Sequence, residues 1–515
     1  MRTRIGRTIL AGLAALAGLA WPQGKEVPLS LNDCIQQTLK NNLNLAAEVL
    51  TPEMGAEAVG LAREIFIPRV SLALGQSSNN SASFSWISSA DKITSNSGDY
   101  QLNLSQLLPT GGRLQATLYS YKTTTTESFM TINPRFGSTL SFEFSQPLLR
   151  NFGTIATRQA ILVAQNDWGV SQSEFRRILM DTVTQVEESY WNLVYSIQNL
   201  QARRDSLKFA QDLLFKNQKE LEAGLISPVE IFNAKAEVAG READIIQAES
   251  EVRDCGRGLA SLINLAPFEG GGEVAVVPTD SPSLEESPMA SDEAIGLALA
   301  NRPELEAGRM RTRTTDVNLS VARNGLLPNL SFNVSYWSPG VSGTRILYQD
   351  DNPLTGVVIG AIPGGPADAL KDAMHLRYRN WSFNLTLDIP INTVVSRAAY
   401  AQAKLASDQS ALRLKDEERR IVLEVQTALN AVETNYKRAM AYRASRELEE
   451  EKLRAEEKKL AAGLSTSYLV LQHQRDLAAA RSNELRAMAD YNLSLARRDK
   501  ALGRTLETKH IQVSD

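Results

Sequence analysis

The chain has 515 residues, a formal net charge of −4, 43% hydrophobic residues and only 6% aromatic residues. Few aromatics, together with long blocks rich in Ala, Leu, Glu, Gln and Arg, are typical of long helices rather than of several compact cores. The slightly acidic balance offers no basic face for phosphates, so nucleic acid is excluded as an expected partner.

The N-terminus has the pattern of a secretory signal peptide over residues 1–20. Arg2, Arg4 and Arg7 precede an apolar run from Ile9 to Ala20, which ends in small residues. An N-terminal membrane anchor is the alternative, although a spanning helix needs about 20 apolar residues. We find no other apolar run of that length, so any further insertion into a membrane must use a β-barrel.

Cysteine and histidine give no sign of a reactive centre. Cys34 and Cys255 can form one disulfide or remain two half-buried thiols, and the three histidines have no metal-ligand spacing. No nucleophile, zinc or phosphate-loop motif is present, although a pair of carboxylates leaves no such motif. We therefore expect no metal, no cofactor and no enzymatic activity.

The sequence contains an internal duplication. Three pairs of segments match in the same order, namely 41–45 with 301–305, 62–72 with 322–332, and 221–225 with 460–464. Each half reads as a short helix, strands introduced by proline, a long helix, an Ala-Gly-Leu turn and a second long helix. The predicted organisation is a first repeat over 21–266 (strands about 68–149, helices about 155–266), a linker over 267–288, a second repeat over 289–505 (strands about 328–390, helices about 393–505) and a tail over 506–515.

The strands alternate apolar and polar residues with period two. The pattern is clear at 69–74, 100–105, 140–145, 330–336 and 381–389. Such strands have one apolar face, which is the core of a soluble sandwich or the lipid-facing wall of a membrane barrel. In the barrel, the lipid-facing residues are Leu102, Leu104, Phe142, Phe144, Phe332, Phe383 and Leu385.

The predicted long helices indicate an assembly that resembles a coiled coil. Proline is absent from Leu148 to Ser227 and from Ile391 to the C-terminus, so each long helix can run for about 60 residues, or roughly 90–100 Å. The apolar stripe, exemplified by Ile421, Val425 and Val432, is narrow and rich in neighbouring Ala. The four long helices of one chain would form only a poorly closed core, which indicates oligomerisation.

At the two Ala-Gly-Leu turns (223–227 and 462–467) and the two strand-to-helix prolines (145–149 and 388–391), the sequence resembles the TolC family of outer-membrane channel-tunnels. The resemblance implies an α+β membrane protein of the cell outer membrane. It implies a homotrimer with a 12-stranded β-barrel, four strands per chain, continued by a long α-helical barrel in the periplasm. The implied function is a passive exit duct in a tripartite efflux or type I secretion system, with a periplasmic adaptor protein, an inner-membrane pump and outer-membrane lipid as partners.

The resemblance also implies site residues at the periplasmic tip. Those carried over as adaptor-docking residues are Gly224, Leu225, Ser227, Gly463, Leu464 and Ser467. The glycines and serines can equally serve only to build the turns, whereas exposed leucines at a tip suggest a partner.

The implied periplasmic gate comprises Glu230, Leu469 and Gln472. Leu469 and Gln472 stand where the family has acidic residues, and this departure suggests a less polar gate. Glu230 can equally be a first-turn acid that favours the helix dipole.

Residues 110–136 and 338–379 exceed a four-strand plan, and we expect extracellular loops or barrel extensions there. The alternative function is an exported coiled-coil structural protein or adhesin that has a β domain and no pore.

Overall fold

The computed structural model describes residues 26–83, 92–127, 130–224, 226–265 and 275–511. The expected signal peptide, Leu225 and the first part of the expected linker lie outside these ranges. The chain divides into two compact units, one formed by 1–49, 175–303 and 418–515, and the other by 50–174 and 304–417. Both units therefore combine segments from the two halves of the sequence.

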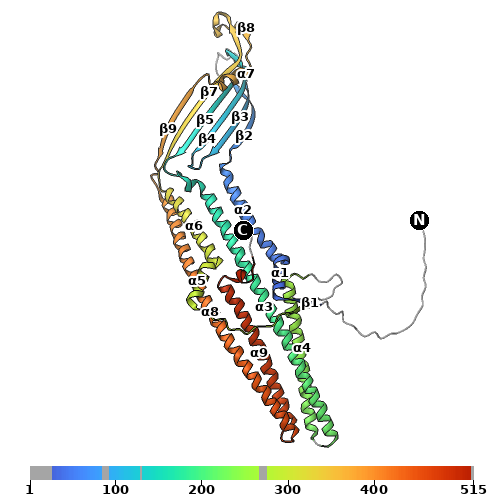
Figure 1. The fold of residues 1–515 in the computed structure, drawn as a ribbon. Helices are drawn as coiled ribbons and strands as arrows, with labels where there is room; N and C mark the ends of the chain where they lie inside the picture. Colours follow the sequence, from blue (N-terminus) through green and yellow to red (C-terminus); the bar gives the residue numbers. More distant parts are fainter. Residues whose placement is uncertain (1–25, 84–91, 128–129, 225, 266–274, 512–515) are drawn as a thin grey trace, which may run out of the picture. The chain divides into compact units, whose positions relative to one another are not determined.

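The elements follow a similar order in both halves, with α7 and α10 as additions in the second (Figure 1). The first half contains β1 (Glu26–Leu29), α1 (Leu31–Asn41), α2 (Leu43–Arg63), β2 (Arg69–Ala82), β3 (Lys92–Leu107), β4 (Arg113–Thr125), β5 (Ile132–Pro147), α3 (Thr154–Glu222) and α4 (Pro228–Leu262). The second contains β6 (Ala275–Pro278), α5 (Ser291–Asn301), α6 (Pro303–Asn324), β7 (Asn329–Tyr348), β8 (Val358–Ile362), α7 (Pro366–Met374), β9 (Asn380–Asp388), α8 (Val394–Ala461), α9 (Ser467–Ala501) and α10 (Thr505–Thr508). The predicted α+β fold is confirmed.

The strands of 50–174 and 304–417 form one antiparallel sheet. Within the described residues it has seven strands in the order β2-β3-β4-β5-β7-β8, and β9 also pairs with β7. The resemblance implied four barrel strands per chain, and this sheet has three strands more within the described residues. Residues 113–125 form a strand that pairs along both edges, with β3 and with β5, and β7 continues far enough to pair with β8 beyond the end of β9.

The sheet has one apolar face and one polar face, as the alternation predicts. Of the residues expected to face lipid, Phe144 and Phe332 are partly buried, and the exposed ones are Leu102, Leu104, Phe142, Phe383 and Leu385. As far as the structure describes this unit, no second sheet packs on the apolar face. The buried sandwich, which needs such a sheet, is therefore not observed.

The long helices exceed the predicted length. α3 has 69 residues and α8 has 68, because neither contains a proline to interrupt its hydrogen bonds. In the described ranges, no helix is both long enough and apolar enough to cross a membrane.

The core of the helical unit is a narrow seam along α3. Val183, Val186, Tyr190 and Leu193 recur at helical spacing, and each is at most 1% exposed. Tyr190 donates a hydrogen bond to Oδ2 of Asp280 (2.9 Å), which holds the segment after β6 against α3. In α8, Ile421, Val425 and Val432 of the predicted stripe are buried.

A second core lies nearer the helical turns and draws on α3, α4, α8 and α9. Two alanines and five larger apolar residues make up its buried members, which are Ala210, Leu213, Ala234, Leu453, Val470, Leu471 and Leu477. Cys34 and Cys255 both remain free thiols, so the disulfide that the sequence allowed is not formed.

Candidate gate and docking site at the helical turns

Each long helix pair is joined by a glycine turn of the same geometry. Gly224 follows α3 and Gly463 follows α8, and both have φ = +75°. In each turn the glycine N–H donates to a carbonyl three residues earlier, Leu221 (2.9 Å) and Leu460 (3.0 Å) respectively. Glycine is favoured at both positions because the left-handed conformation costs a residue with a side chain about 1 kcal/mol or more.

The residues after the two turns differ in their surroundings. Ser227 is exposed and caps α4 by accepting a hydrogen bond from the Val229 N–H, with Pro228 in the first helical position. Ser467, in contrast, is only 5% exposed, and its Oγ donates to Oδ1 of Asn217 on α3 (2.8 Å). Ser467 therefore joins α9 to α3, and its role in docking stays a prediction.

Apolar side chains are exposed at the glycine turns and near the starts of α4 and α9. Leu464 is 79% exposed, and it was expected at the tip from the sequence. Val229, Phe232 and Tyr468 are also strongly exposed, at 59%, 68% and 56%. These three residues were not predicted from the sequence, although an apolar residue that follows a turn directly and lies outside the helical stripe indicates exposure.

The three expected gate residues are not joined to one another. Glu230 lies in the first turn of α4, partly buried, and its Oε2 atom has no hydrogen-bond partner among the described residues. Leu469 and Gln472 are exposed on α9.

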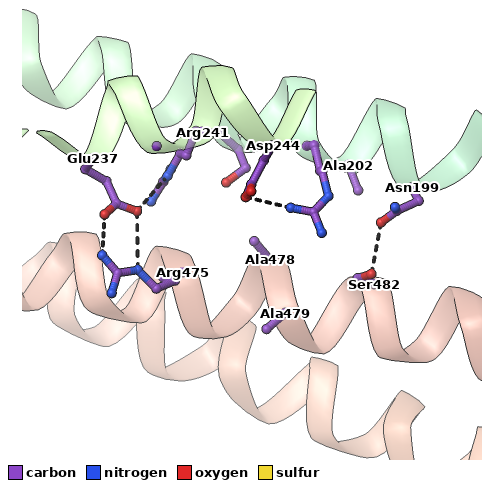
Figure 2. Close-up of a pocket in the computed structure, with 12 residues that line it drawn as sticks. Asn199, Ala202, Glu237, Arg241, Asp244, Arg475, Ala478, Ala479 and Ser482 are labelled. Atoms are coloured by element: carbon purple, nitrogen blue, oxygen red, sulfur yellow. Dashed lines mark hydrogen bonds and ion pairs between the residues drawn. The ribbon is translucent and has the colours of Figure 1, made fainter. Parts of the chain in front are cut away.

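A cluster that the sequence analysis missed joins α4 to α9. We call Glu237, Arg241 and Arg475 the Glu237 clasp. Arg241 Nε donates to Glu237 Oε1 (3.0 Å) from one helical turn away, and Arg475 pairs with Glu237 Oε2 from the opposite helix. Figure 2 shows the Glu237 carboxylate lying between the two guanidinium groups. The i, i+4 pair on α4 was readable from the sequence, but the partnership with Arg475, 238 positions away, was not.

The clasp borders a groove of about 360 Å³ among α3, α4 and α9 (Figure 2). Arg241 is buried and also donates to the Ser206 carbonyl (2.5 Å). Further along the groove, Ser482 Oγ donates to Asn199 Oδ1 (2.9 Å), which links α9 to α3. The same three helices are therefore joined by polar contacts at several levels.

The electrostatics keep the clasp charged. Burial alone would raise the pKa of Glu237, but hydrogen bonds from Arg475 and Arg241 outweigh it and hold the pKa below its ordinary value of 4.5. Burial lowers the pKa of Arg241, although the neighbouring Glu237 carboxylate opposes that shift. At neutral pH the carboxylate is ionised and pairs with both guanidinium groups.

One group of described side chains has ligand atoms close enough for a metal ion. These are Glu449, His473 and Asp476, whose atoms lie within 4.8 Å of one another. Lys452 already pairs with Glu449 (2.6 Å), and its ammonium group opposes a cation there. The group therefore gives no reason to assign a metal.

Known proteins share both the sequence pattern and this fold. The chain is 21% identical over 384 residues to outer membrane protein TolC of Vibrio cholerae serotype O1, covering 74% of this chain and 80% of that protein. The CmeC outer membrane channel of Campylobacter jejuni superimposes with a TM-score of 0.65 at 15% identity, covering 97% of this chain and 94% of that one. The open state of the MtrE outer membrane channel of Neisseria gonorrhoeae gives 0.63 at 18% identity, covering 92% and 89%.

The match to a family profile falls in two segments. The profile of the outer membrane efflux protein family matches residues 140–265 and 294–504, one segment in each half of the duplicated sequence. These two segments make up more than half of the chain. The chain therefore belongs to the outer membrane efflux protein family.

Proposed function

We propose that three copies of this outer-membrane efflux protein form a passive exit duct. The strands of the three copies close a β-barrel in the outer membrane, and α3, α4, α8 and α9 form an α-helical barrel that extends into the periplasm. A periplasmic adaptor protein and an inner-membrane pump deliver substrate to the helical end, as part of a tripartite efflux or type I secretion system. No catalytic step is assigned to the duct.

The observation that carries this proposal is the sheet with an open apolar face. Leu72, Leu102 and Phe383 are 66%, 45% and 63% exposed, although they belong to the most apolar positions of their strands. A contiguous apolar face of this kind is costly in water and favourable against lipid, while the polar face is suited to a water-filled lumen. The same strands lead directly into α3 and α8, which are long enough to extend the lumen well beyond the membrane.

The exposed apolar residues at the turns are the proposed adaptor-docking surface. Leu464 and the neighbouring Tyr468 at one turn, and Val229 and Phe232 near the other, are apolar and strongly exposed, and so can serve as anchors for a partner. Gly224 and Gly463 shape these turns, and Ser227 lies exposed beside the first of them. Leu225 is proposed as a further anchor from its position in the Ala-Gly-Leu motif.

The proposed gate has two parts. Glu230, Leu469 and Gln472 narrow the lumen near the turns, where Glu230 from each of three copies adds a ring of negative charge. The Glu237 clasp joins α4 of the first repeat to α9 of the second through the exposed Arg475, and it is broken in each chain when the tip opens.

The first test is the native mass of the full chain, extracted in detergent from separated membranes. A trimer in the outer-membrane fraction that conducts ions in planar bilayers is the expected result. A monomer or dimer outside that fraction would overturn the duct and favour the structural protein without a pore.

Docking is tested by photo-crosslinking in cells. A photoreactive residue at position 464 should crosslink to a protein that mass spectrometry identifies as a membrane-fusion adaptor. Leu412 of α8, which is 67% exposed, is the matched control and should give no such product. Equal crosslinking at both positions would contradict a specific docking surface at the turns.

A further inference from the structure

A continuous apolar band crosses the sheet from β2 to β9. Hydrogen-bonded register connects its members from strand to strand, in the order Val70, Leu104, Ala116, Phe142, Tyr336 and Trp381. The strands β3 and β4, which exceed the four expected per chain, contribute as fully as their neighbours, through Tyr100, Leu102, Leu104, Leu114, Ala116 and Leu118. The β3–β4 hairpin is thus part of the same apolar face.

The band runs obliquely to the register. In β2, Val70 is its member nearest the helices, yet register connects Val70 to Trp381, the member of β9 farthest from α8. In β9 the band continues from Trp381 toward α8 as far as Leu387. From β2 to β9 the band therefore moves toward the helices by about one residue per strand, relative to the hydrogen-bonded register. With about 3.3 Å per residue and about 4.8 Å between strands, a band of constant height requires a strand tilt of about 35°, as in closed barrels.

The strands of the β3–β4 hairpin, with 16 and 13 residues, are about as long as the neighbouring β2 and β5, with 14 and 16. Its turn closes with a hydrogen bond from the Leu108 N–H to the Gly112 carbonyl (2.7 Å) and lies at the helical end, where the Gly153 N–H donates to Thr110 (3.1 Å). Gly111 has φ = +90°, and a Cβ there would lie 2.6 Å from the Asn151 carbonyl. The turn is therefore fitted against the segment that leads into α3.

The polar face is continuous through the hairpin as well. Thr117 of β4 donates to Oδ1 of Asn103 on β3 (3.0 Å), and Ser141 of β5 donates to the Thr117 carbonyl (3.4 Å). A hairpin folded outside the wall would have no reason to carry both faces in register with its neighbours.

The two edges of the sheet are complementary. Among the described residues, β2 pairs only with β3, and β9 pairs only with β7, which leaves one edge of each strand unpaired. Neighbouring strands alternate in direction, so β2 and β9 run oppositely and can pair as antiparallel strands. Unpaired backbone groups are not tolerated in lipid, and therefore these edges need a partner.

We propose that three copies of this chain close a barrel of eighteen strands, in which β2 of one copy pairs with β9 of the next. Each copy contributes β2, β3, β4, β5, β7 and β9. The proposal rests on the trimeric duct proposed above and changes its width. At a tilt of about 35–40°, eighteen strands give a barrel about 36 Å across, compared with about 24 Å for twelve. The membrane part of the duct is then wide, and any selection by size falls to the helical end.

A matched pair of substitutions in β4 tests whether the hairpin belongs to the wall. Ala116 lies in the apolar band, whereas the adjacent Gln115 lies on the polar face, opposite Glu143. We expect Ala116→Arg to abolish assembled trimer in the outer-membrane fraction and Gln115→Arg to leave it at the level of the unaltered protein. Assembly of both variants would overturn the proposal, because a hairpin surrounded by water tolerates arginine on either face.

Single-particle imaging of the unaltered trimer in detergent gives the second, independent test. Eighteen strands in the wall, with β2 beside the neighbour's β9, are the expected result. A trimer with twelve wall strands and the β3–β4 hairpin outside would overturn the eighteen-stranded barrel alone. Absence of a trimer would overturn this proposal and the proposed duct together.

Discussion

Replacement of Glu237 by glutamine is the sharpest test of the clasp. The substitution keeps the shape of the side chain but removes the charge that offsets Arg241 and Arg475. The Arg241 side chain is 7% exposed, so its guanidinium loses its compensating charge in a buried place, whereas Arg475 is 69% exposed and can turn to water. The cost therefore falls mainly on Arg241.

The magnitude follows from this difference in burial. Removing one partner of a buried ion pair costs about 3–5 kcal/mol. Arg241 keeps its hydrogen bond to the Ser206 carbonyl, so we expect about 3 kcal/mol, the lower end of the range. Arg475→Gln removes only the exposed partner and should cost less than about 1 kcal/mol.

Hydrogen exchange of the detergent-solubilised protein measures the effect where it arises. Amides of α4 and α9 beside the clasp should lose protection by about 150-fold in Glu237→Gln and by less than about 5-fold in Arg475→Gln. Because the folded pKa of Glu237 is lowered, its contribution is present above its ordinary value of 4.5 and is lost as the pH falls through the lowered value. The difference between Glu237→Gln and the unaltered protein should thus stay constant from about pH 6 to pH 8. Equal, small losses in both variants would refute the clasp.

Three further predictions concern other parts of the molecule. Burial, followed by the nearby charges of Asp33 and Asp280, raises the pKa of Cys34 to about 12, so iodoacetamide at pH 8 should label it only after unfolding, as mass spectrometry of the labelled peptide would show. Phe383→Arg should cost about 2–4 kcal/mol of stability in the membrane and prevent outer-membrane assembly, whereas the Asn384→Arg variant, altered on the opposite face, should assemble. Fractionation and native gels distinguish the two variants, and equal outcomes would contradict the assigned faces. Gly463→Ala should cost about 1 kcal/mol in thermal unfolding because of its positive φ alone, since a Cβ there meets no atom within 4 Å; a neutral effect would show that the turn relaxes.

Local sequence patterns foresaw the elements of this fold well. Alternation in 100–105 and 140–145 predicted strands where β3 and β5 lie, because consecutive residues of a strand point to opposite faces. The absence of proline after Leu148 foresaw a helix as long as α3, and Gly224 and Gly463 marked its turn and that of α8. These features depend on backbone geometry within a few residues, and the sequence displays them directly.

The number of strands in the sheet was harder to foresee. Residues 113–118 also alternate apolar and polar, but a period-two pattern does not say which strands such a segment pairs with. The structure places β4 between β3 and β5 through tertiary pairing along both edges. A strand within the sheet and a strand of a surface hairpin show the same alternation, so only the pairing with β3 and β5 identifies β4 as part of the sheet.

The candidate site divides in the same way. The sequence by itself determined the duplicated strand–helix–turn–helix order and the glycine turns, because these are encoded within short segments. Only the tertiary structure buried Ser467 against Asn217, brought Arg475 to Glu237 from 238 positions away, and aligned the apolar residues of β2 through β9 in one band. Such contacts depend on how helices and strands distant in sequence pack together, which no local pattern of residues contains.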